Sequence, residues 1–166
     1  MKPTKENTLY LTIKQVYFDA IVAGLKKEEY REIKNTTYKK YLEVDEEGWP
    51  LYHSGLIDAE NPLLGDLCIW NNGVYPYVAN QKWEYLSLAV GYAKARDTAI
   101  VEIEDITFEP LTDKEGHFAR FSVSDDDEAK LDANGEYCFW LAVFHLGKVV
   151  EVHKVKTFGS LSSSFQ

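Results

Sequence analysis

The strongest constraint on the fold is a series of short segments in which apolar residues alternate with polar ones. Leu9, Leu11 and Ile13 begin this pattern near the N-terminus. Successive side chains of a β-strand point to opposite faces, so the alternation indicates strands with one buried face. Residues 83–92 fit either a strand or a short helix. The segments that we predict to be strands are 9–13, 26–34, 67–70, 99–108, 118–123, 137–145 and 149–155, the last two joined by a turn at residues 146–148.

Helical periodicity is clear only near the N-terminus. From Gln15 the apolar residues follow the period of a short amphipathic helix, and Gly24 suits the left-handed position that often ends a helix. Asn35 is a candidate cap for a second short helix, and the acidic segment 125–132 is a candidate helical turn. Strands and helices do not alternate along the chain. The sequence therefore predicts an α+β fold, a small and mostly antiparallel β-barrel with two or three short peripheral helices.

The length of 166 residues suits one domain. We expect a single domain over residues 1–158, with turn-rich insertions near residues 44–65 and 109–135. A flexible Ser-rich tail is expected over residues 159–166.

Charge is unevenly distributed along the chain. The first 40 residues carry nine basic and five acidic side chains, a net charge of +4, whereas the other 126 carry nine and twenty-two, a net charge of −13. The total of −9 excludes a uniformly basic nucleic-acid binder and a polybasic membrane-surface protein. It leaves room for a local anion-binding surface formed by the N-terminal quarter.

Nothing in the sequence indicates a membrane segment, a metal or a cofactor. The longest apolar run, residues 137–144, is far too short for a membrane helix, and the N-terminus lacks the apolar core of a signal peptide. Cys68 and Cys138 lie in apolar runs and are expected to be buried thiols. The histidines show no metal-binding spacing; they are His53, His117, His145 and His153. We expect a cytoplasmic protein.

The most informative segment is residues 24–31, with the sequence Gly-Leu-Lys-Lys-Glu-Glu-Tyr-Arg. Glu29 and Arg31 would share one face of a strand, and Lys26 lies in the preceding turn, from which it could reach the same cleft. An ammonium, a guanidinium and a carboxylate together suit a phosphate or a polar base edge, and they also suit acid–base chemistry. The alternative is that Glu29 and Arg31 form a partly buried ion pair with a structural role only.

Three stretches together resemble the ASCH domain family, which belongs to the PUA-like β-barrel superfamily. The first is the pattern G-x-K-x-x-E-x-R at residues 24–31, preceded by a strand and a helix. The others are Ile-Glu-Asp-Ile at residues 103–106 and His-Leu-Gly-Lys-Val-Val at residues 145–150, which resembles the closing hairpin of many ASCH proteins. The residues that match the first pattern are Leu9, Leu11, Ile13, Lys14, Tyr17, Phe18, Asp19, Ile21, Gly24, Lys26, Glu29 and Arg31.

The resemblance implies a five- or six-stranded barrel with a cleft beside the first helix, in which family members are thought to bind RNA or other nucleic acid. Some members are hydrolases, either ribonucleases or amidohydrolases of acetylated cytidine. In the amidohydrolase branch the lysine at the position of Lys26 and a threonine at that of Glu29 are catalytic, with a distant glutamate for which Glu109 and Glu115 are candidates. This chain departs from that branch at Glu29.

A second candidate for ligand binding is the loop that carries Tyr92, Lys94 and Arg96, whose cations would grip a phosphate while the ring stacks on a base. The alternative is a solvated loop. The tryptophans Trp70, Trp83 and Trp140 would form either a base-stacking wall or part of the core.

Three functions are compatible with these features. The first is a nucleic-acid-binding module, for RNA or a modified nucleotide, in which Lys26 and Arg31 hold a phosphate or base edge and Glu29 orients Arg31. The second is a small hydrolase that uses Lys26 and Glu29 in acid–base roles. The third is a barrel that binds a protein partner and uses the Glu29–Arg31 pair as a brace.

Overall fold

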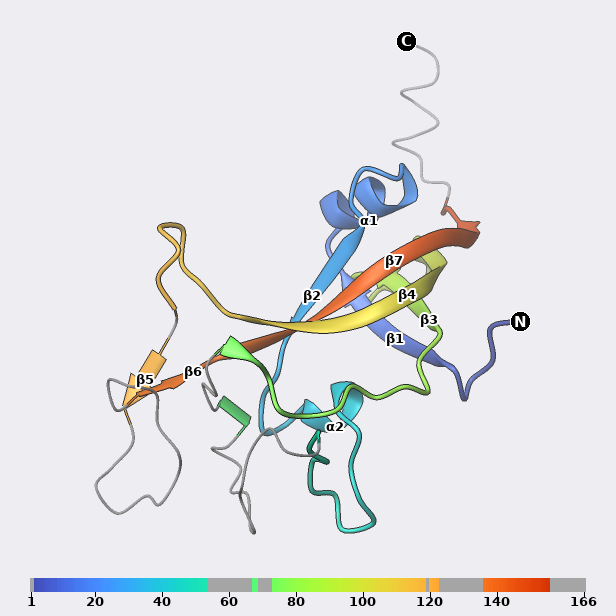
Figure 1. The fold of residues 1–166 in the computed structure, drawn as a ribbon. Coiled ribbons are helices and arrows are strands. Elements are labelled where there is room, and N and C mark those ends of the chain that lie inside the picture. Colours follow the sequence, from blue (N-terminus) through green and yellow to red (C-terminus); the bar gives the residue numbers. More distant parts are fainter. Residues whose placement is uncertain (1, 54–66, 69–72, 119, 123–135, 156–166) are drawn as a thin grey trace. The chain divides into compact units, whose positions relative to one another are not determined.

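The computed structural model describes residues 2–53, 67–68, 73–118, 120–122 and 136–155 (Figure 1). The chain divides into two compact units. Unit 1 comprises Met1–Glu28, Lys82–Glu104 and His145–Gln166, and unit 2 comprises Glu29–Gln81 and Asp105–Phe144. The elements in chain order are β1 (Thr8–Ile13), α1 (Gln15–Val22), β2 (Glu28–Glu32), α2 (Tyr38–Tyr41), β3 (Tyr85–Val90), β4 (Thr98–Pro110), β5 (Arg120–Ser122), β6 (Glu136–Cys138) and β7 (Trp140–His153).

Five of the strands form one sheet in the order β1-β3-β4-β7-β2, and β5 and β6 form a separate antiparallel pair. The sheet is mixed, because β1 runs parallel to β3 whereas β3 and β4 are antiparallel. Within the described residues the sheet is open, with β1 and β2 at its edges. The predicted α+β class with short helices is thus confirmed, whereas the predicted closed barrel is not confirmed.

Unit 1 is built on the pairing of β1 with β3, in which Leu9 lies opposite Leu86 and Leu11 opposite Leu88. These four leucines are buried, as the period-two alternation of both segments predicts. Residues 83–92, for which the sequence allowed either a strand or a helix, contain the strand β3. The apolar face of this strand pair therefore provides the surface on which α1 packs.

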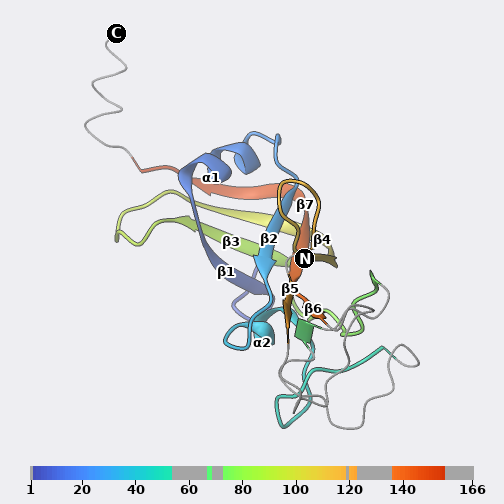
Figure 2. The same cartoon turned by 90° about the vertical axis from the view of Figure 1, so that its left-hand side faces the viewer.

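Helix α1 lies beside the C-terminal half of β7 in unit 1 (Figures 1 and 2). Phe18 and Ile21 are its buried residues, while Val16 and Tyr17 are exposed, so its apolar face is narrower than predicted. The helix ends as expected at Gly24, whose φ of 76° is left-handed.

Unit 2 has an aromatic core. Trp140 is fully buried, and the Tyr75 ring lies 4.7 Å from its ring between centroids. The short helix α2 contributes Tyr41, which meets Phe144 edge-on at 5.9 Å. Burying several large rings supplies much of the apolar area that stabilises a small unit. The other buried apolar residues of unit 2 are Ile33, Tyr38, Leu42, Leu67, Cys68, Tyr77, Ala79, Ala142 and Val143.

Two local predictions in unit 2 are wrong. The residue that precedes α2 is Thr37, not Asn35, and its side chain makes no capping hydrogen bond. Leu67 and Cys68 form a 3₁₀ turn instead of the predicted strand. Both side chains are buried. The short apolar run therefore indicated burial of these residues but did not determine their backbone conformation.

The prediction of a turn at residues 146–148 is also wrong, because β7 continues through them as one strand of 14 residues. Gly147 allows this close packing. A β-carbon placed on Gly147 would lie 2.9 Å from Cγ of Glu104 and 3.4 Å from Cβ of Glu102 on the neighbouring strand β4. Gly147 allows two strands to approach closely. From sequence alone, a glycine with this role cannot be distinguished from a glycine in a turn.

Several predictions fall outside the described residues: most of the insertion 44–65, much of the insertion 109–135, the helical turn at 125–132, the tail 159–166, Trp70, and the side chain of Cys138. Cys68 is a buried thiol, as expected. Among the described residues, no helix is long and apolar enough to cross a membrane.

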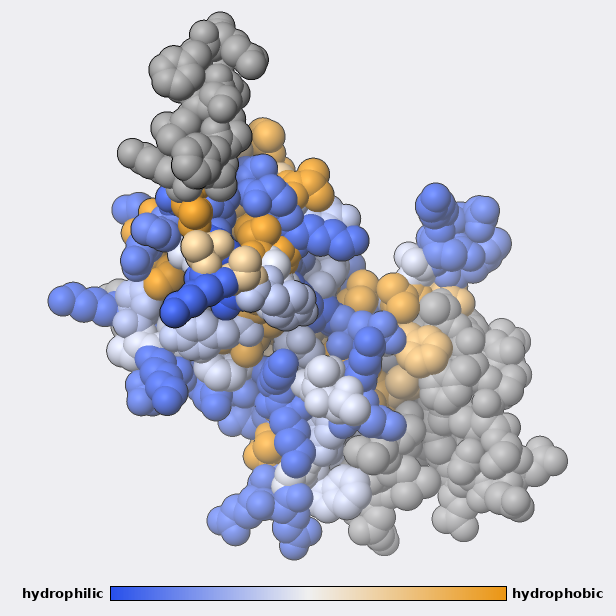
Figure 3. Space-filling model, turned by 180° about the vertical axis from the view of Figure 1, so that it is seen from behind, coloured by the Kyte–Doolittle hydropathy of each residue, from blue (hydrophilic) through white to orange (hydrophobic). Residues whose placement is uncertain are grey.

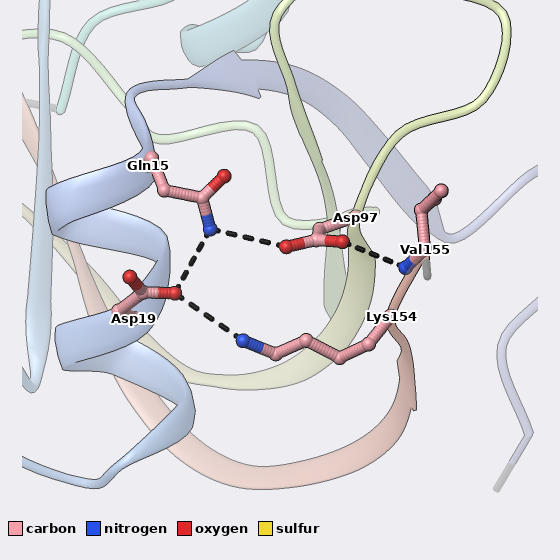
Figure 4. Close-up of polar contacts among 5 residues, drawn as sticks. All are labelled: Gln15, Asp19, Asp97, Lys154 and Val155. Atoms are coloured by element: carbon pink, nitrogen blue, oxygen red, sulfur yellow. Dashed lines mark hydrogen bonds and ion pairs between the residues drawn. The ribbon is translucent and has the colours of Figure 1, made fainter. Parts of the chain in front are cut away.

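A polar cluster, here called the helix clasp, joins the start of α1 to the residues after β7 (Figure 4). The Gln15 side-chain amide donates to Asp19 at 2.9 Å and to Asp97 at 3.1 Å. Asp97 also accepts the backbone N–H of Val155 at 2.8 Å, and Lys154 pairs with Asp19 at 3.4 Å. The helix clasp therefore ties α1, the end of the β3–β4 loop and the end of β7 together.

The approach of β7 to β4 can be tested by replacing Gly147 with Ala. The added methyl group would push Glu104 aside, and we expect a loss of about 1 kcal/mol in the free energy of unfolding, measured by urea denaturation. The double variant Gly147→Ala, Glu104→Ala should recover most of this loss, because the clash is removed. An equal loss in both variants would show that the close approach is not the cause.

The helix clasp predicts an acid-sensitive contribution to stability. The hydrogen bond from Val155 lowers the pKa of Asp97, with smaller contributions from Gln15 and Lys154. A carboxyl whose pKa is lower in the folded chain adds stability at neutral pH, and this is lost as the pH falls through its folded-state value. Between about pH 5 and 2, unfolding free energy should therefore fall more steeply for the wild type than for Asp97→Asn. Parallel curves would contradict the prediction.

Candidate functional site

The turn after α1 holds Lys26 in a defined position in unit 1. The Gly24 N–H donates to the Ile21 carbonyl at 3.0 Å, and the N–H groups of Leu25 and Lys26 both donate to the Ala20 carbonyl, at 2.9 and 3.1 Å. This glycine-terminated helix end fixes the backbone from which the Lys26 side chain extends. Its ammonium lies 5.6 Å from the centroid of the Tyr17 ring, a cation–π contact that restrains the side chain further.

Lys26 lines a cavity of about 280 Å³ in unit 1, here called the lysine cavity. It lies between the end of α1, one position of β4 and the middle of β7, beside the first helix. Its walls carry three lysines, Lys26, Lys27 and Lys148. Its lining residues, within the part of the chain that the structure describes, are Ile21, Val22, Ala23, Gly24, Lys26, Lys27, Val101, Leu146, Gly147, Lys148 and Val149.

The lysine cavity combines lysine side chains with backbone carbonyls at the end of α1. Three ammonium groups supply positive charge and hydrogen-bond donors. At the end of α1, by contrast, no donor among the described residues bonds to the carbonyls of Val22 or Ala23. The last carbonyls of a helix carry partial negative charge. The lysine cavity can therefore accept an anionic group and, beside it, a group that donates N–H or O–H bonds.

Carboxylates of unit 1 also lie near the lysine cavity. Glu102 accepts the backbone N–H of Lys148 at 3.0 Å, which holds the backbone of β7 beside β4. Glu28 lies 3.7 Å from the His145 ring, and both side chains are about one third exposed or more. The Leu146 N–H donates to the Lys27 carbonyl at 2.8 Å, so β7 and the turn after α1 are joined directly.

Glu29 and Arg31 lie in unit 2 and form an ion pair at 3.2 Å, as their spacing on one strand face predicts. Glu29 is 6% exposed, and its other oxygen accepts the Tyr30 N–H at 3.0 Å. Both carboxylate oxygens are thus used by hydrogen bonds. The Arg31 side chain is 27% exposed and keeps part of its guanidinium at the surface.

Tyr41 belongs to the same cluster in unit 2, and sequence reasoning missed it. Burial raises the pKa of the Tyr41 hydroxyl, the charge of Arg31 lowers it, and the charge of Glu29 raises it. A neutral phenol beside a buried carboxylate and a guanidinium is consistent with a structural cluster. In the sequence, nothing distinguishes Tyr41 from the neighbouring Tyr38.

The structure thus assigns Lys26 to unit 1 and both Glu29 and Arg31 to unit 2. Lys26 lines a cavity in unit 1, and ligand binding by Lys26, Glu29 and Arg31 stays a prediction. Sequence reasoning missed Lys27, which was read only as a spacer within the motif. It also missed Lys148, because the surrounding segment was interpreted as a hairpin turn and not as a continuous strand.

The loop that carries Tyr92, Lys94 and Arg96 projects from the ends of β3 and β4 in unit 1 (Figure 2). Tyr92 is 88% exposed, and Lys94 is exposed as well. One guanidinium nitrogen of Arg96 donates to the Gly91 carbonyl at 2.6 Å, so part of Arg96 serves to close the loop. The arrangement agrees with a solvated loop and leaves ligand binding by these residues a prediction.

The remaining candidates have structural roles or lie at the surface. Trp140 is core, and Trp83 is half-buried beneath the ammonium of Lys82, 4.4 Å from its ring centroid. Glu109 and Glu115, the candidates for a distant catalytic glutamate, are both exposed in unit 2.

One exposed group of possible metal ligands occurs among the described residues, namely Asp113, Glu115 and His117. The N–H groups of Glu115 and His117 both donate to one Asp113 carboxylate oxygen at 2.9 Å. The Asp113 carboxylate therefore stabilises the turn between Thr112 and Phe118, and this accounts for the cluster without an ion.

Comparison with protein-family models, with curated proteins and with solved structures finds no match to this chain. The chemistry that this protein performs must therefore be inferred from its own residues.

The Glu29–Arg31 pair predicts a difference between two glutamates of the same strand. Glu29→Gln removes the buried carboxylate charge that pairs with Arg31, and we expect a loss of about 1–2 kcal/mol in unfolding free energy. The matched control is Glu32→Gln, because Glu32 is 36% exposed and lies 4.0 Å from Lys34. The control should cost less than about 0.5 kcal/mol by urea denaturation. Equal losses would contradict the structural role of Glu29.

Proposed function

We propose that this protein is a nucleic-acid-binding module of the ASCH type, with a PUA-like barrel, that takes RNA or a nucleotide-like ligand in the lysine cavity. The observation that carries the proposal is a cavity beside α1 that is lined by three lysines, one of which is Lys26 of the motif. The resemblance to ASCH domains places the ligand cleft beside the first helix. The position of the lysine cavity in unit 1 is consistent with that expectation.

Charge supports a phosphate-bearing ligand. The first 40 residues have a net charge of +4 in a chain of −9, and they contain Lys26 and Lys27. Lys148 joins them at the same cavity from the C-terminal part of unit 1. An ammonium is an effective partner for phosphate even as a point charge, and three together would bind one or two phosphates.

The polarity of the lysine cavity suggests how such a ligand lies. Phosphate oxygens would face the three lysines, and N–H groups of the base would face the carbonyls of Val22 and Ala23 at the end of α1. A ligand that combines an anion with N–H donors is better matched than a bare anion. Nucleotides with an amino-substituted base have this combination.

The acidic remainder of the chain limits this function. A net charge of −13 over residues 41–166 opposes long-range attraction of polynucleotide. With at most three phosphate contacts, the logarithm of affinity for single-stranded RNA should fall with the logarithm of salt concentration with a slope of about −2. The protein would thus be a selective binder of a short anionic target.

The engagement of Glu29 favours binding over hydrolysis. A general acid or base must exchange a proton with the substrate at hydrogen-bond distance. Both oxygens of Glu29 already accept hydrogen bonds, from Tyr30 and from Arg31, and the side chain is 6% exposed. We therefore assign Glu29 and Arg31 to the stability of unit 2, and the ligand to the lysine cavity.

The test is fluorescence anisotropy with a short, labelled, mixed-sequence single-stranded RNA at low salt. We expect Lys26→Glu and Lys148→Glu each to weaken binding at least tenfold and to reduce the salt slope by about 0.7–1. Lys5→Glu is the matched control, because it makes the same change of charge at an exposed lysine that does not line the lysine cavity. The control should weaken binding by less than about threefold.

Two results would overturn the proposal. One is the absence of saturable RNA binding by the wild type at low salt. The other is an equal loss in the Lys5 control and in the two cavity variants, because a loss without position dependence reflects net charge alone. Thermal melting of each variant would establish that folding is unchanged.

A further inference from the structure

Unit 2 contains a second cavity of about 410 Å³, here called the aromatic cavity. Its size falls in the range of pockets that bind small molecules, about 300–1,000 Å³. None of its residues lines the lysine cavity, and none was singled out as a ligand-binding candidate from the sequence. The lining residues are His53, Gly73, Val74, Tyr75, Tyr77, Ala79, Gln81, Ile106, Thr107 and Phe108.

The walls of the aromatic cavity are held rigidly by ring packing. Tyr75 lies 4.8 Å from Phe108 and meets Tyr77 edge-on at 5.3 Å between ring centroids. Tyr77 in turn stacks on Tyr52 at 5.0 Å with an angle of 29°. The Tyr75 hydroxyl donates to the Leu67 carbonyl at 2.7 Å, which fixes that ring in its plane. A set of rings preorganised in this way loses little entropy when a flat molecule enters.

The described residues that line the aromatic cavity carry no carboxylate, ammonium or guanidinium group. Their polar side chains are those of His53, Gln81 and Thr107, which supply a ring nitrogen, an amide and a hydroxyl. A charged ligand would lose its hydration here without gaining an opposite charge, which is costly. An uncharged ligand with hydrogen-bonding edges meets no such cost.

The entrance to the aromatic cavity can be located from exposure. Val74 is 51% exposed, and His53 and Gln81 are exposed as well, whereas Tyr75 and Tyr77 are buried. On the face that Figure 3 displays, apolar areas are interspersed with hydrophilic side chains. An exposed valine at the rim of a ring-lined cavity provides apolar surface that an entering ligand would cover.

We propose that the aromatic cavity binds a neutral, planar heteroaromatic molecule. One of its faces would lie against the partly exposed ring of Phe108, and its edge would exchange hydrogen bonds with Gln81 and Thr107. The proposal does not rest on nucleic-acid binding by unit 1, because the two cavities share no residue. It adds a second ligand class of opposite character, neutral and flat instead of anionic.

The experiment is a titration of the full chain with indole and caffeine, followed by ligand-observed NMR and calorimetry. Indole-3-acetate serves as an anionic analogue of the same ring system. For ligands of this size in a good pocket we expect a Kd on the order of 0.1–1 mM. The anionic analogue should bind at least fivefold more weakly than indole.

Position is tested by filling the entrance. Val74→Trp and His53→Trp place a large side chain at exposed positions of the aromatic cavity, where it displaces no buried residue. Each should weaken binding at least tenfold. Val150→Trp is the matched control, because Val150 is 41% exposed and lies in unit 1. The control should leave binding unchanged.

The proposal is overturned if neither neutral probe shows saturable binding up to about 5 mM, which is above the weakest affinity expected for such a pocket. It is also overturned if both entrance variants bind as the wild type does, or if indole-3-acetate binds as tightly as indole. Loss of RNA binding in the lysine variants with retention of caffeine binding would separate this site from the lysine cavity.

Discussion

Much of unit 1 depends on the close approach of β7 to β4 at Gly147. Because this residue has no β-carbon, Glu102 and Glu104 fit against the backbone of β7, and β7 continues without a turn. The continuous strand then places Lys148 on the wall of the lysine cavity, opposite the end of α1. A hairpin at the same point would have directed the following residues elsewhere. The position of Lys148 in the candidate site thus follows from the continuity of β7 through Gly147.

The second constraint is the burial of a charge in unit 2. A carboxylate that is 6% exposed requires partners, and Glu29 finds them in the Arg31 guanidinium and the Tyr30 amide. These bonds occupy the very oxygens that acid–base chemistry would need. Glu29 is therefore better explained as a structural brace than as a catalytic group.

The two cavities suit chemically different ligands. One is bordered by three ammonium groups and by helix carbonyls, which suits an anion with N–H donors. The other is bordered by tyrosine and phenylalanine rings with neutral polar edges, which suits a flat uncharged molecule. In a chain of 166 residues with a net charge of −9, the proposed binding of an anion depends on the three lysines gathered at the lysine cavity.

The sequence by itself determined the local features of this protein. Alternation in Leu9, Leu11 and Ile13 specified the first strand, Gly24 specified the end of α1, and the spacing of Glu29 and Arg31 specified their pairing. All of these depend on residues a few positions apart, where backbone geometry fixes the relation between side chains. Only the tertiary structure decided that Gly147 lies within a strand, that Lys148 joins Lys26, and that rings from residues 75, 77 and 108 enclose a cavity. These relations join residues far apart in the chain, and local periodicity carries no information about which distant segments pack together.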